Sequence, residues 1–157
     1  MVNFTGVDGL AEVTATGAGL LVNGTTVFTI TGGPIRITDL VSYAIVDSDS
    51  AASTLQWSAD GTVGAATTFT GATTSTASLI AGTIIYCNFT ALATAPVITQ
   101  TAGVALAGPT TSTGGGIYVP AGIITMVIGG ADTTTSTWQH FMRWYPLGPG
   151  ISVAAAF

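Results

Sequence analysis

The residue types that most often carry out chemistry are scarce in this chain and lie far apart. It contains one histidine, His140, and one cysteine, Cys87. His140 lies in a strand-like run beside Trp138 and Trp144, and Cys87 lies in an apolar segment, so we interpret both as structural side chains. No Gly-x-Ser-x-Gly elbow occurs, and without a lysine no phosphate-binding loop can be completed. The sequence therefore predicts no catalytic residue, no cofactor site and no enzyme.

Two carboxylates, Asp47 and Asp49, could supply hard oxygen ligands to calcium. A loop of aspartate and serine is commonly just solvated, so we predict no metal site there. A glycosidase pair has little support, because Glu12 is the only glutamate and the aspartates lie mostly in turn-like segments. A sugar-binding platform is conceivable, but core packing is the better interpretation for the three tryptophans, Trp57, Trp138 and Trp144.

Charge is the most unusual property of the composition. Charged residues make up 6% of the chain, against about 25% in an average soluble domain. The only basic residues are Arg36 and Arg143, and the net charge is −5. A protein that binds nucleic acid or an anionic membrane needs basic residues on its surface, so neither is expected as a partner. We expect each arginine to pair with a carboxylate, within the subunit or across an interface, with Asp39 a candidate for Arg36.

The elements that must position these residues are predicted to be strands. Threonine, valine, isoleucine and aromatic residues dominate, glycine and proline punctuate them, and helix signals are nearly absent. We predict an all-β fold, an antiparallel β-sandwich, jelly-roll-like or barrel. Residues 1–17 are expected to form an extended N-terminal arm, and residues 18–157 a single all-β domain.

Four local signals are specific enough to test. Asn23-Gly24 and Asp60-Gly61 predict hairpin turns. The longest strand is expected over 35–46, with Asp39 marking a bulge or bend. The last full strand is expected over 137–147 and, because both of its faces carry large aromatics, it is predicted to be covered on both sides. Alternation within 35–46 predicts two faces: Ile35, Ile37, Val41, Tyr43 and Ile45 on one, and Arg36, Thr38, Ser42 and Ala44, joined by Leu40, on the other.

Three segments resemble small virion proteins of tailed bacteriophages. They are VFTITGGPIRITDL at 27–40, YVPAGII at 118–124, and Trp138 followed by RWYPL at 143–147. Their order and spacing match over roughly residues 25–150, whereas segment 1–17 departs from the pattern. The composition is similar to that of capsid decoration, or cement, proteins. This resemblance implies an all-β subunit, usually trimeric, on the outside of the major capsid shell, with no catalytic motif.

The expected function is that of a structural virion protein. We expect a decoration subunit that forms a homotrimer, binds the major capsid protein on the outer capsid surface and stabilises the shell. A chain this poor in charge is expected to have much of its surface covered by neighbours. One alternative is a tail or fibre component with host-binding loops at 108–116 and 129–136. A less favoured one is a carbohydrate-binding module or β-sandwich hydrolase.

Overall fold

The computed structural model describes residues 11–87, 89, 92, 94–99 and 116–156, and this part of the chain is built from strands without a helix. The predicted all-β fold is confirmed. Among these residues, accordingly, no helix is long and apolar enough to cross a membrane. The strands in chain order are β1 (Ala11–Gly19), β2 (Thr26–Thr31), β3 (Ile35–Val46), β4 (Ser53–Gly61), β5 (Thr67–Thr68), β6 (Ile84–Tyr86), β7 (Val97–Thr99), β8 (Ile117–Val119), β9 (Gly122–Gly130), β10 (Thr137–Pro146) and β11 (Ser152–Ala155).

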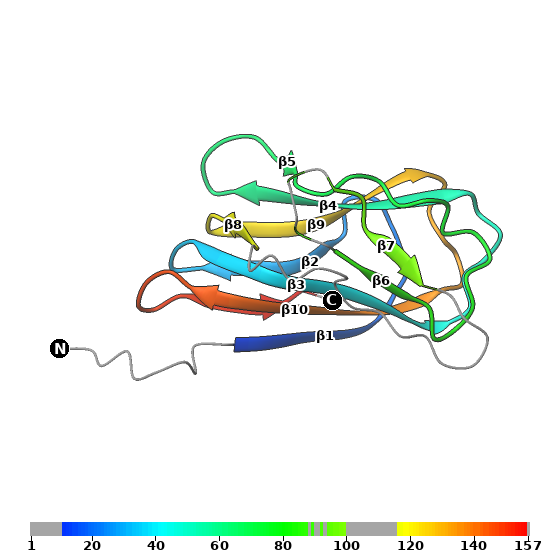
Figure 1. The fold of residues 1–157 in the computed structure, drawn as a ribbon, viewed down its shortest axis with the longest axis horizontal. Coiled ribbons are helices and arrows are strands. Elements are labelled where there is room, and N and C mark those ends of the chain that lie inside the picture. Colours follow the sequence, from blue (N-terminus) through cyan, green and yellow to red (C-terminus); the bar gives the residue numbers. More distant parts are fainter. Residues whose placement is uncertain (1–10, 88, 90–91, 93, 100–115, 157) are drawn as a thin grey trace.

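The strands form two antiparallel sheets (Figure 1). Sheet A has the order β1-β10-β3-β6-β7, and β8 also pairs with β3. Sheet B has the order β11-β2-β9-β4-β5. Each sheet is open, with edge strands β1 and β7 in sheet A and β11 and β5 in sheet B.

Both sheets contribute to one hydrophobic core, and its burial is the main favourable term for folding. Alternate residues of β10 point into it, which fits a strand with period-two alternation. Their counterparts in sheet B come from β2, β4 and β9. Large contributors include Trp138, Met142 and Trp144 from sheet A, and Phe28, Leu55, Trp57, Ile124 and Met126 from sheet B.

The pairing of β3 with β10 forms the middle of sheet A and contains a bulge. Residues 35–46 form one strand, as predicted. The register passes from Arg143 opposite Asp39 to Trp144 opposite Ile37, so Thr38 is the extra residue. This confirms the predicted irregularity beside Asp39.

The bulge makes the predicted faces of this strand wrong. An extra residue shifts the alternation by one, so side chains beyond it change sides. Ile35 and Ile37 are buried before the bulge, whereas Leu40, Ser42 and Ala44 are buried after it. Val41, Tyr43 and Ile45 therefore point outward instead of into the core.

The Asn23-Gly24 turn forms, but the hairpin predicted there does not. Gly24 has φ +78°, a conformation that glycine adopts readily. The strands on either side belong to different sheets, β1 to sheet A and β2 to sheet B. The turn is held by its neighbours: the Asn23 amide donates to Asp132 Oδ1 at 2.8 Å, and Asn23 Oδ1 accepts from the Ile128 amide at 3.0 Å. The chain thus crosses between sheets at this turn.

The turn predicted at Asp60-Gly61 forms later in the chain than expected. Both residues lie inside β4, and β4 pairs with the two-residue strand β5 after an intervening loop at 62–66. The strand that follows this turn signal, β5, is therefore only two residues long. Gly61 pairs with Gly122, whose φ is +150° and whose added Cβ would collide with the Asp60 carbonyl oxygen.

Beyond β5, threonine side chains take the place of a strand along the edge of β4. The Thr73 amide donates to the Leu55 carbonyl at 3.0 Å, and the Leu55 amide donates to Thr73 Oγ1 at 2.9 Å. The Trp57 amide likewise donates to Thr70 Oγ1 at 2.9 Å. Two residues before Leu55 on β4, the Ser53 carbonyl accepts from the Thr76 amide at 2.8 Å.

We call Thr70, Thr73 and Thr76 the threonine ladder. These threonines are three residues apart in the chain, and they bond to residues of β4 that are two apart. All three side chains are buried. Buried backbone groups need partners, because an unpaired one costs the free energy of its lost hydration. The ladder therefore closes an edge that would otherwise expose unpaired amides.

The segment predicted as an extended arm, 1–17, is divided at residue 11. Residues 11–17 belong to β1, which pairs with β10 from Ala11 opposite Trp144 to Ala15 opposite His140. Residues 1–10 lie outside the described residues.

Replacing Thr73 with valine tests the ladder. The shape is kept but the Leu55 amide loses its buried acceptor, so we expect the free energy of unfolding to fall by about 1–3 kcal/mol. Urea denaturation measures this change. Thr73→Ser keeps the hydroxyl and should lose less. The matched control is Thr74→Val at the exposed neighbouring position, expected to change stability by less than about 0.5 kcal/mol. Equal losses for Thr73→Val and Thr74→Val would contradict the ladder.

Candidate interaction surface

His140 is a structural residue of the core, as the sequence analysis expects. Its side chain is fully buried, and Nδ1 lies 2.6 Å from the Ser42 hydroxyl oxygen. Ser42 is also fully buried. Burial disfavours the charged imidazolium and lowers the pKa of His140 to about 3. A serine–histidine pair without solvent access cannot meet a substrate, so we assign it to packing.

The other residues considered for chemistry are also in the core. Cys87 is buried, and burial raises the pKa of its thiol well above the usual value, which suppresses the reactive thiolate. Trp57, Trp138 and Trp144 are buried, so they do not form an exposed row that could stack on a sugar. Among the described residues, no three side chains of histidine, cysteine, aspartate or glutamate are grouped to hold a metal.

Asp47 and Asp49 hold different loops instead of converging on one point. Asp47 Oδ1 accepts from the Ala81 amide at 2.6 Å. Asp49 Oδ2 accepts from the Thr134 amide at 2.6 Å and from the Thr134 hydroxyl at 2.8 Å, while its Oδ1 accepts from the Ala51 amide at 3.0 Å. Hydrogen bonds from Thr134 and Ala51 lower the pKa of Asp49 below its usual value. These carboxylates act as acceptors for backbone amides.

The loop at 129–136, considered for host binding, is fixed by internal hydrogen bonds. Gly129 and Gly130 belong to β9. The Leu21 amide donates to Thr133 Oγ1 at 2.9 Å, and the Thr133 amide donates to the Leu21 carbonyl at 3.1 Å. Thr133 is buried, so it repeats the pattern of the threonine ladder. The second loop considered, 108–116, lies outside the described residues except for Gly116.

The outer face of sheet A gathers aromatic and basic side chains. On β10, Phe141, Arg143 and Tyr145 alternate with the buried core residues and point outward. They meet the outward residues of β3 across the pairing, because directly opposite residues lie on the same face. Successive rows across the sheet are Tyr145–Arg36–Tyr118, Arg143–Asp39, Phe141–Val41–Tyr86 and Gln139–Tyr43–Ile84.

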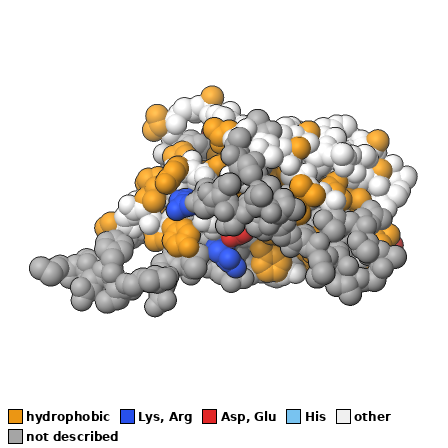
Figure 2. Space-filling view, viewed as in Figure 1, with side chains coloured by type: hydrophobic (Ala, Val, Ile, Leu, Met, Phe, Trp, Pro, Cys, Tyr) orange, Lys and Arg blue, Asp and Glu red, His pale blue; other side chains and the backbone are white. Residues whose placement is uncertain are grey.

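This face holds all four tyrosines and both arginines of the chain. Tyr118 is 70% exposed, Ile45 46% and Tyr43 38%. Figure 2 shows the two basic side chains on one side of the molecule, with an acidic patch and hydrophobic side chains close by. Tyrosine and arginine are enriched where proteins bind each other, whereas lysine and acidic residues are depleted there. We refer to this surface as the aromatic face.

The ion pair on the aromatic face is not the one suggested by the sequence. Asp39 pairs with Arg143 across β3 and β10, with Nη1 3.6 Å from Oδ2. The suggested pairing of Asp39 with Arg36 was wrong, because Asp39 lies opposite Arg143 of β10 whereas Arg36 lies opposite Tyr145 and Tyr118. The side chains are 52% and 41% exposed, so the pair contributes at most about 1 kcal/mol. Arg36 lies over the ring of Tyr145, with Cζ 6.0 Å from the centroid.

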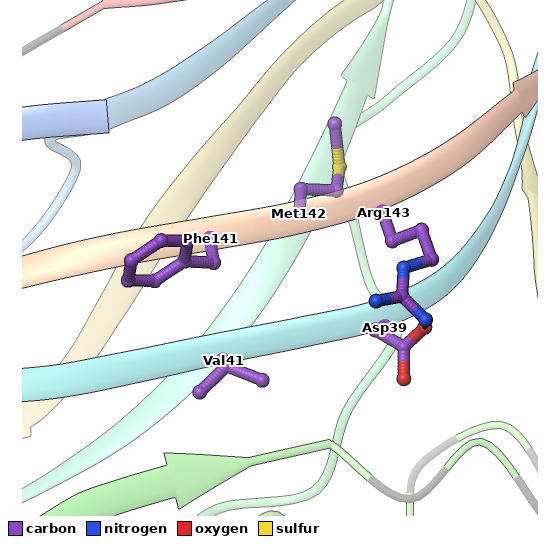
Figure 3. A pocket seen from close by; sticks show the side chains of 5 residues that line it. All are labelled: Asp39, Val41, Phe141, Met142 and Arg143. Carbon is purple, nitrogen blue, oxygen red and sulfur yellow. Dashed lines mark ion pairs between the residues drawn. The ribbon is translucent and has the colours of Figure 1, made fainter. Parts of the chain in front are cut away.

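A shallow hollow lies beside this ion pair (Figure 3). Its volume is about 140 Å³, and its lining residues are Asp39, Val41, Phe141, Met142 and Arg143. Figure 3 shows Arg143 bending toward Asp39, while Met142 points away from both. Sites for small organic ligands usually span about 300–1,000 Å³. The hollow is therefore more suited to a single inserted side chain.

Sequence reasoning missed this face because it expected a bulge or bend at Asp39 but still assigned the side chains on both sides of it by one unbroken alternation. Because Val41, Tyr43 and Ile45 were assigned to the apolar, inward face, the predicted outer surface lacked these apolar residues. The usable signal was Asp39 itself, since a carboxylate on an apolar face indicates a change of phase. The strand β10 was predicted to be covered on both sides; one of its faces is buried in the core, whereas its outward side chains are half-buried or exposed and form the aromatic face.

Comparison with known proteins gives no relative: no family model, no curated protein and no solved structure matches the chain.

The buried histidine predicts a dependence of stability on pH. Above about pH 6.5 the imidazole is neutral in both states. As pH falls, the unfolded chain takes up a proton that the folded protein excludes until about pH 3, so the free energy of unfolding decreases. Because this is the only histidine, His140→Gln should remove most of the slope between about pH 7 and 5. Denaturation of both proteins across this range measures it. Identical slopes would contradict a buried neutral His140.

Asp49 predicts a second dependence at lower pH. Its folded pKa is lowered, so its stabilisation is present above the unfolded value of about 3.9 and is lost as pH falls through the folded pKa. Asp49→Asn should therefore be less stable than the natural protein at pH 6, and the difference should shrink below about pH 4. Thermal unfolding at each pH measures it. Asp60→Asn, at the end of β4, controls for the lost charge. A difference that persists unchanged at the lowest pH would contradict the assignment.

Proposed function

We propose that this chain is a structural virion protein, a decoration subunit on the outer surface of a bacteriophage capsid. In this proposal it binds the major capsid protein as a homotrimer, stabilises the shell and catalyses no reaction. Nucleic acid and membrane are not partners. The observation that carries the proposal is the aromatic face, a surface of tyrosine, phenylalanine and arginine on a chain otherwise poor in charge.

The composition of the surface supports an assembly protein over a freely diffusing one. A monomer normally stays soluble through interspersed charges of both signs. Here both basic residues lie on one face, and four aspartates are bound to amides or to an arginine: Asp39, Asp47, Asp49 and Asp132. Contacts repeated around a symmetry axis would give a decoration subunit affinity from many weak interactions.

The phage-like segments fall on elements that build this face. Segment 27–40 contains the start of β3 with Arg36, segment 118–124 begins with Tyr118 of β8, and segment 143–147 ends β10 with Tyr145. The first row of the aromatic face, Tyr145–Arg36–Tyr118, therefore draws one residue from each segment. This coincidence favours a virion role over a carbohydrate-binding module, whose platform would need exposed tryptophans.

A reconstitution experiment tests the proposal. Phage shells that lack this protein are mixed with the purified chain and sedimented. We expect saturable binding at a fixed ratio of this chain to major capsid protein, and a higher temperature for shell disruption. A tail-fibre protein of similar charge and size serves as the control for non-specific adsorption. Failure to co-sediment at micromolar concentrations, or binding to tails in place of shells, would contradict the proposal.

A further inference from the structure

The four edge strands of the two sheets are not equally protected. An edge strand exposes unpaired amides and carbonyls, which invite another strand unless charge, a bulge, shortness or a covering segment opposes it. In sheet A, β1 contains Glu12 and a shift of register between Ala15 and Gly19, and β7 is three residues long. In sheet B, β5 has two residues, and the threonine ladder continues along the same edge. The fourth edge strand, β11, differs from these three.

The edge strand β11 is uncharged, regular and largely exposed. Its sequence is Ser-Val-Ala-Ala, and its register with β2 shows no shift. Pairing continues beyond the strand to Ala156, whose amide donates to the Val27 carbonyl at 3.0 Å. The side chains of Ser152, Ala154 and Ala155 are exposed. This edge therefore lacks a charge, a bulge or a bulky side chain that would keep another strand away.

The hydrogen bond from Ala156 fixes which backbone groups of β11 point away from β2. In an antiparallel pair, residues that exchange hydrogen bonds alternate with residues whose amides and carbonyls point to the opposite edge. Ala156 and Ala154 therefore bond to β2. The amides and carbonyls of Val153 and Ala155 point to the open side instead, and no described residue forms a hydrogen bond with them there.

We propose that an extended segment of the major capsid protein adds to sheet B as a further strand beside β11. The inference rests on the proposed function and deepens it, because it names a second part of the subunit that engages the shell and the form in which the partner binds. Backbone donors and acceptors at the spacing of a strand are satisfied together by another extended backbone. The main-chain hydrogen bonds supply affinity, and the fit of alternate side chains supplies selectivity.

The hydrogen bonding elsewhere in the chain supports a strand as the occupant of this edge. Side chains supply acceptors for backbone amides at other edges and loops, as Thr73 does for Leu55. The strand β11 has a single hydroxyl, that of Ser152, and it lies 2.7 Å from the Thr31 hydroxyl of β2. Its backbone groups on the open side are therefore left for a partner.

The sandwich is narrow at this edge, which restricts the strand that can add there. The inward side chains become smaller from β2 to β11, since Val153 lies opposite Ile30 and Ala155 opposite Phe28. Among the described strands, β1 and β11 make the closest approach between the two sheets. We expect the incoming strand to carry glycine, alanine or serine at the positions that face β1.

A second copy of this chain fits the edge less well than the capsid protein. Two β11 strands paired antiparallel would be related by a twofold axis, which the proposed trimer does not have. A head-to-tail pairing would need β1, β5 or β7 of the neighbour, and these edges carry the features that oppose strand addition.

Amide hydrogen exchange, read residue by residue by mass spectrometry, tests the proposal on the natural protein. The free chain is compared with the chain bound to phage shells that lack it. We expect the amides of Val153 and Ala155 to exchange about tenfold or more slowly on shells. The Ala154 amide, bonded to β2 in both states, should change less. Val63, 91% exposed in the loop after β4, should not change.

A matched pair of substitutions at one position gives a second test. Ala155→Pro removes an amide on the open side, where proline is tolerated in an edge strand, and keeps the bonds to β2. Ala155→Ser keeps the amide and a small side chain. We expect Ala155→Pro to bind shells about tenfold or more weakly and Ala155→Ser to bind within about twofold of the natural protein. Blue-shifted emission from the buried tryptophans checks that both variants fold. If Ala155→Pro does not fold, the exchange measurement decides alone.

Three results would overturn the inference. The first is shell binding in which Val153 and Ala155 exchange as in the free chain. The second is equal binding by folded Ala155→Pro and Ala155→Ser. The third is protection of Val153 and Ala155 in the concentrated chain without shells, which would make another copy the occupant. Each of these leaves the decoration role standing if the chain binds shells. Absence of binding to shells would reject the decoration role, and this inference with it.

Discussion

Scarcity of charge is the constraint on which the rest of this structure depends. With only two basic residues, the protein cannot stabilise its surface with a network of ion pairs. Its carboxylates serve mainly as acceptors for backbone amides: Asp47 for Ala81, Asp49 for Ala51 and Thr134, and Asp132 for Asn23. Threonine hydroxyl groups accept backbone amides at buried edges. Thr73 accepts from the Leu55 amide and Thr133 from the Leu21 amide, and the amide of each threonine donates back to the carbonyl of the same leucine. The threonine content of the chain is thereby part of its hydrogen-bonding scheme as well as a strand preference.

The same constraint separates the two outer faces. Threonine and serine, together with Asp60 opposite Ile123, give the outer face of sheet B a polar surface. Sheet A instead brings its tyrosines and both arginines together on one surface. The β3 part of this surface depends on a single backbone irregularity, the bulge at Thr38, which sends Val41, Tyr43 and Ile45 outward and places Asp39 against Arg143. A regular strand would have buried those three side chains and left the face without its apolar residues from β3.

Much of the fold could be predicted from the sequence, because its signals are local. Strand propensity and period-two alternation located β3 and β10. Pairing partners could not be predicted this way. Asn23-Gly24 forms its turn, but tertiary contacts with Asp132 and Ile128 direct the next strand into the other sheet. The aromatic face was missed for a related reason, since one extra residue reverses every later side chain and only the register with β10 reveals it.

The central claim is that the aromatic face of sheet A is buried against protein when this chain is assembled. Hydroxyl-radical footprinting read by mass spectrometry measures this directly, by comparing the assembled protein with the chain at a dilution where it is dissociated. We predict that Tyr43, Tyr118 and Phe141 lose reactivity on assembly, while Ile123 and Val127 on the outer face of sheet B keep theirs. Tyrosines that react equally in both states, or protection confined to the outer face of sheet B, would contradict the account.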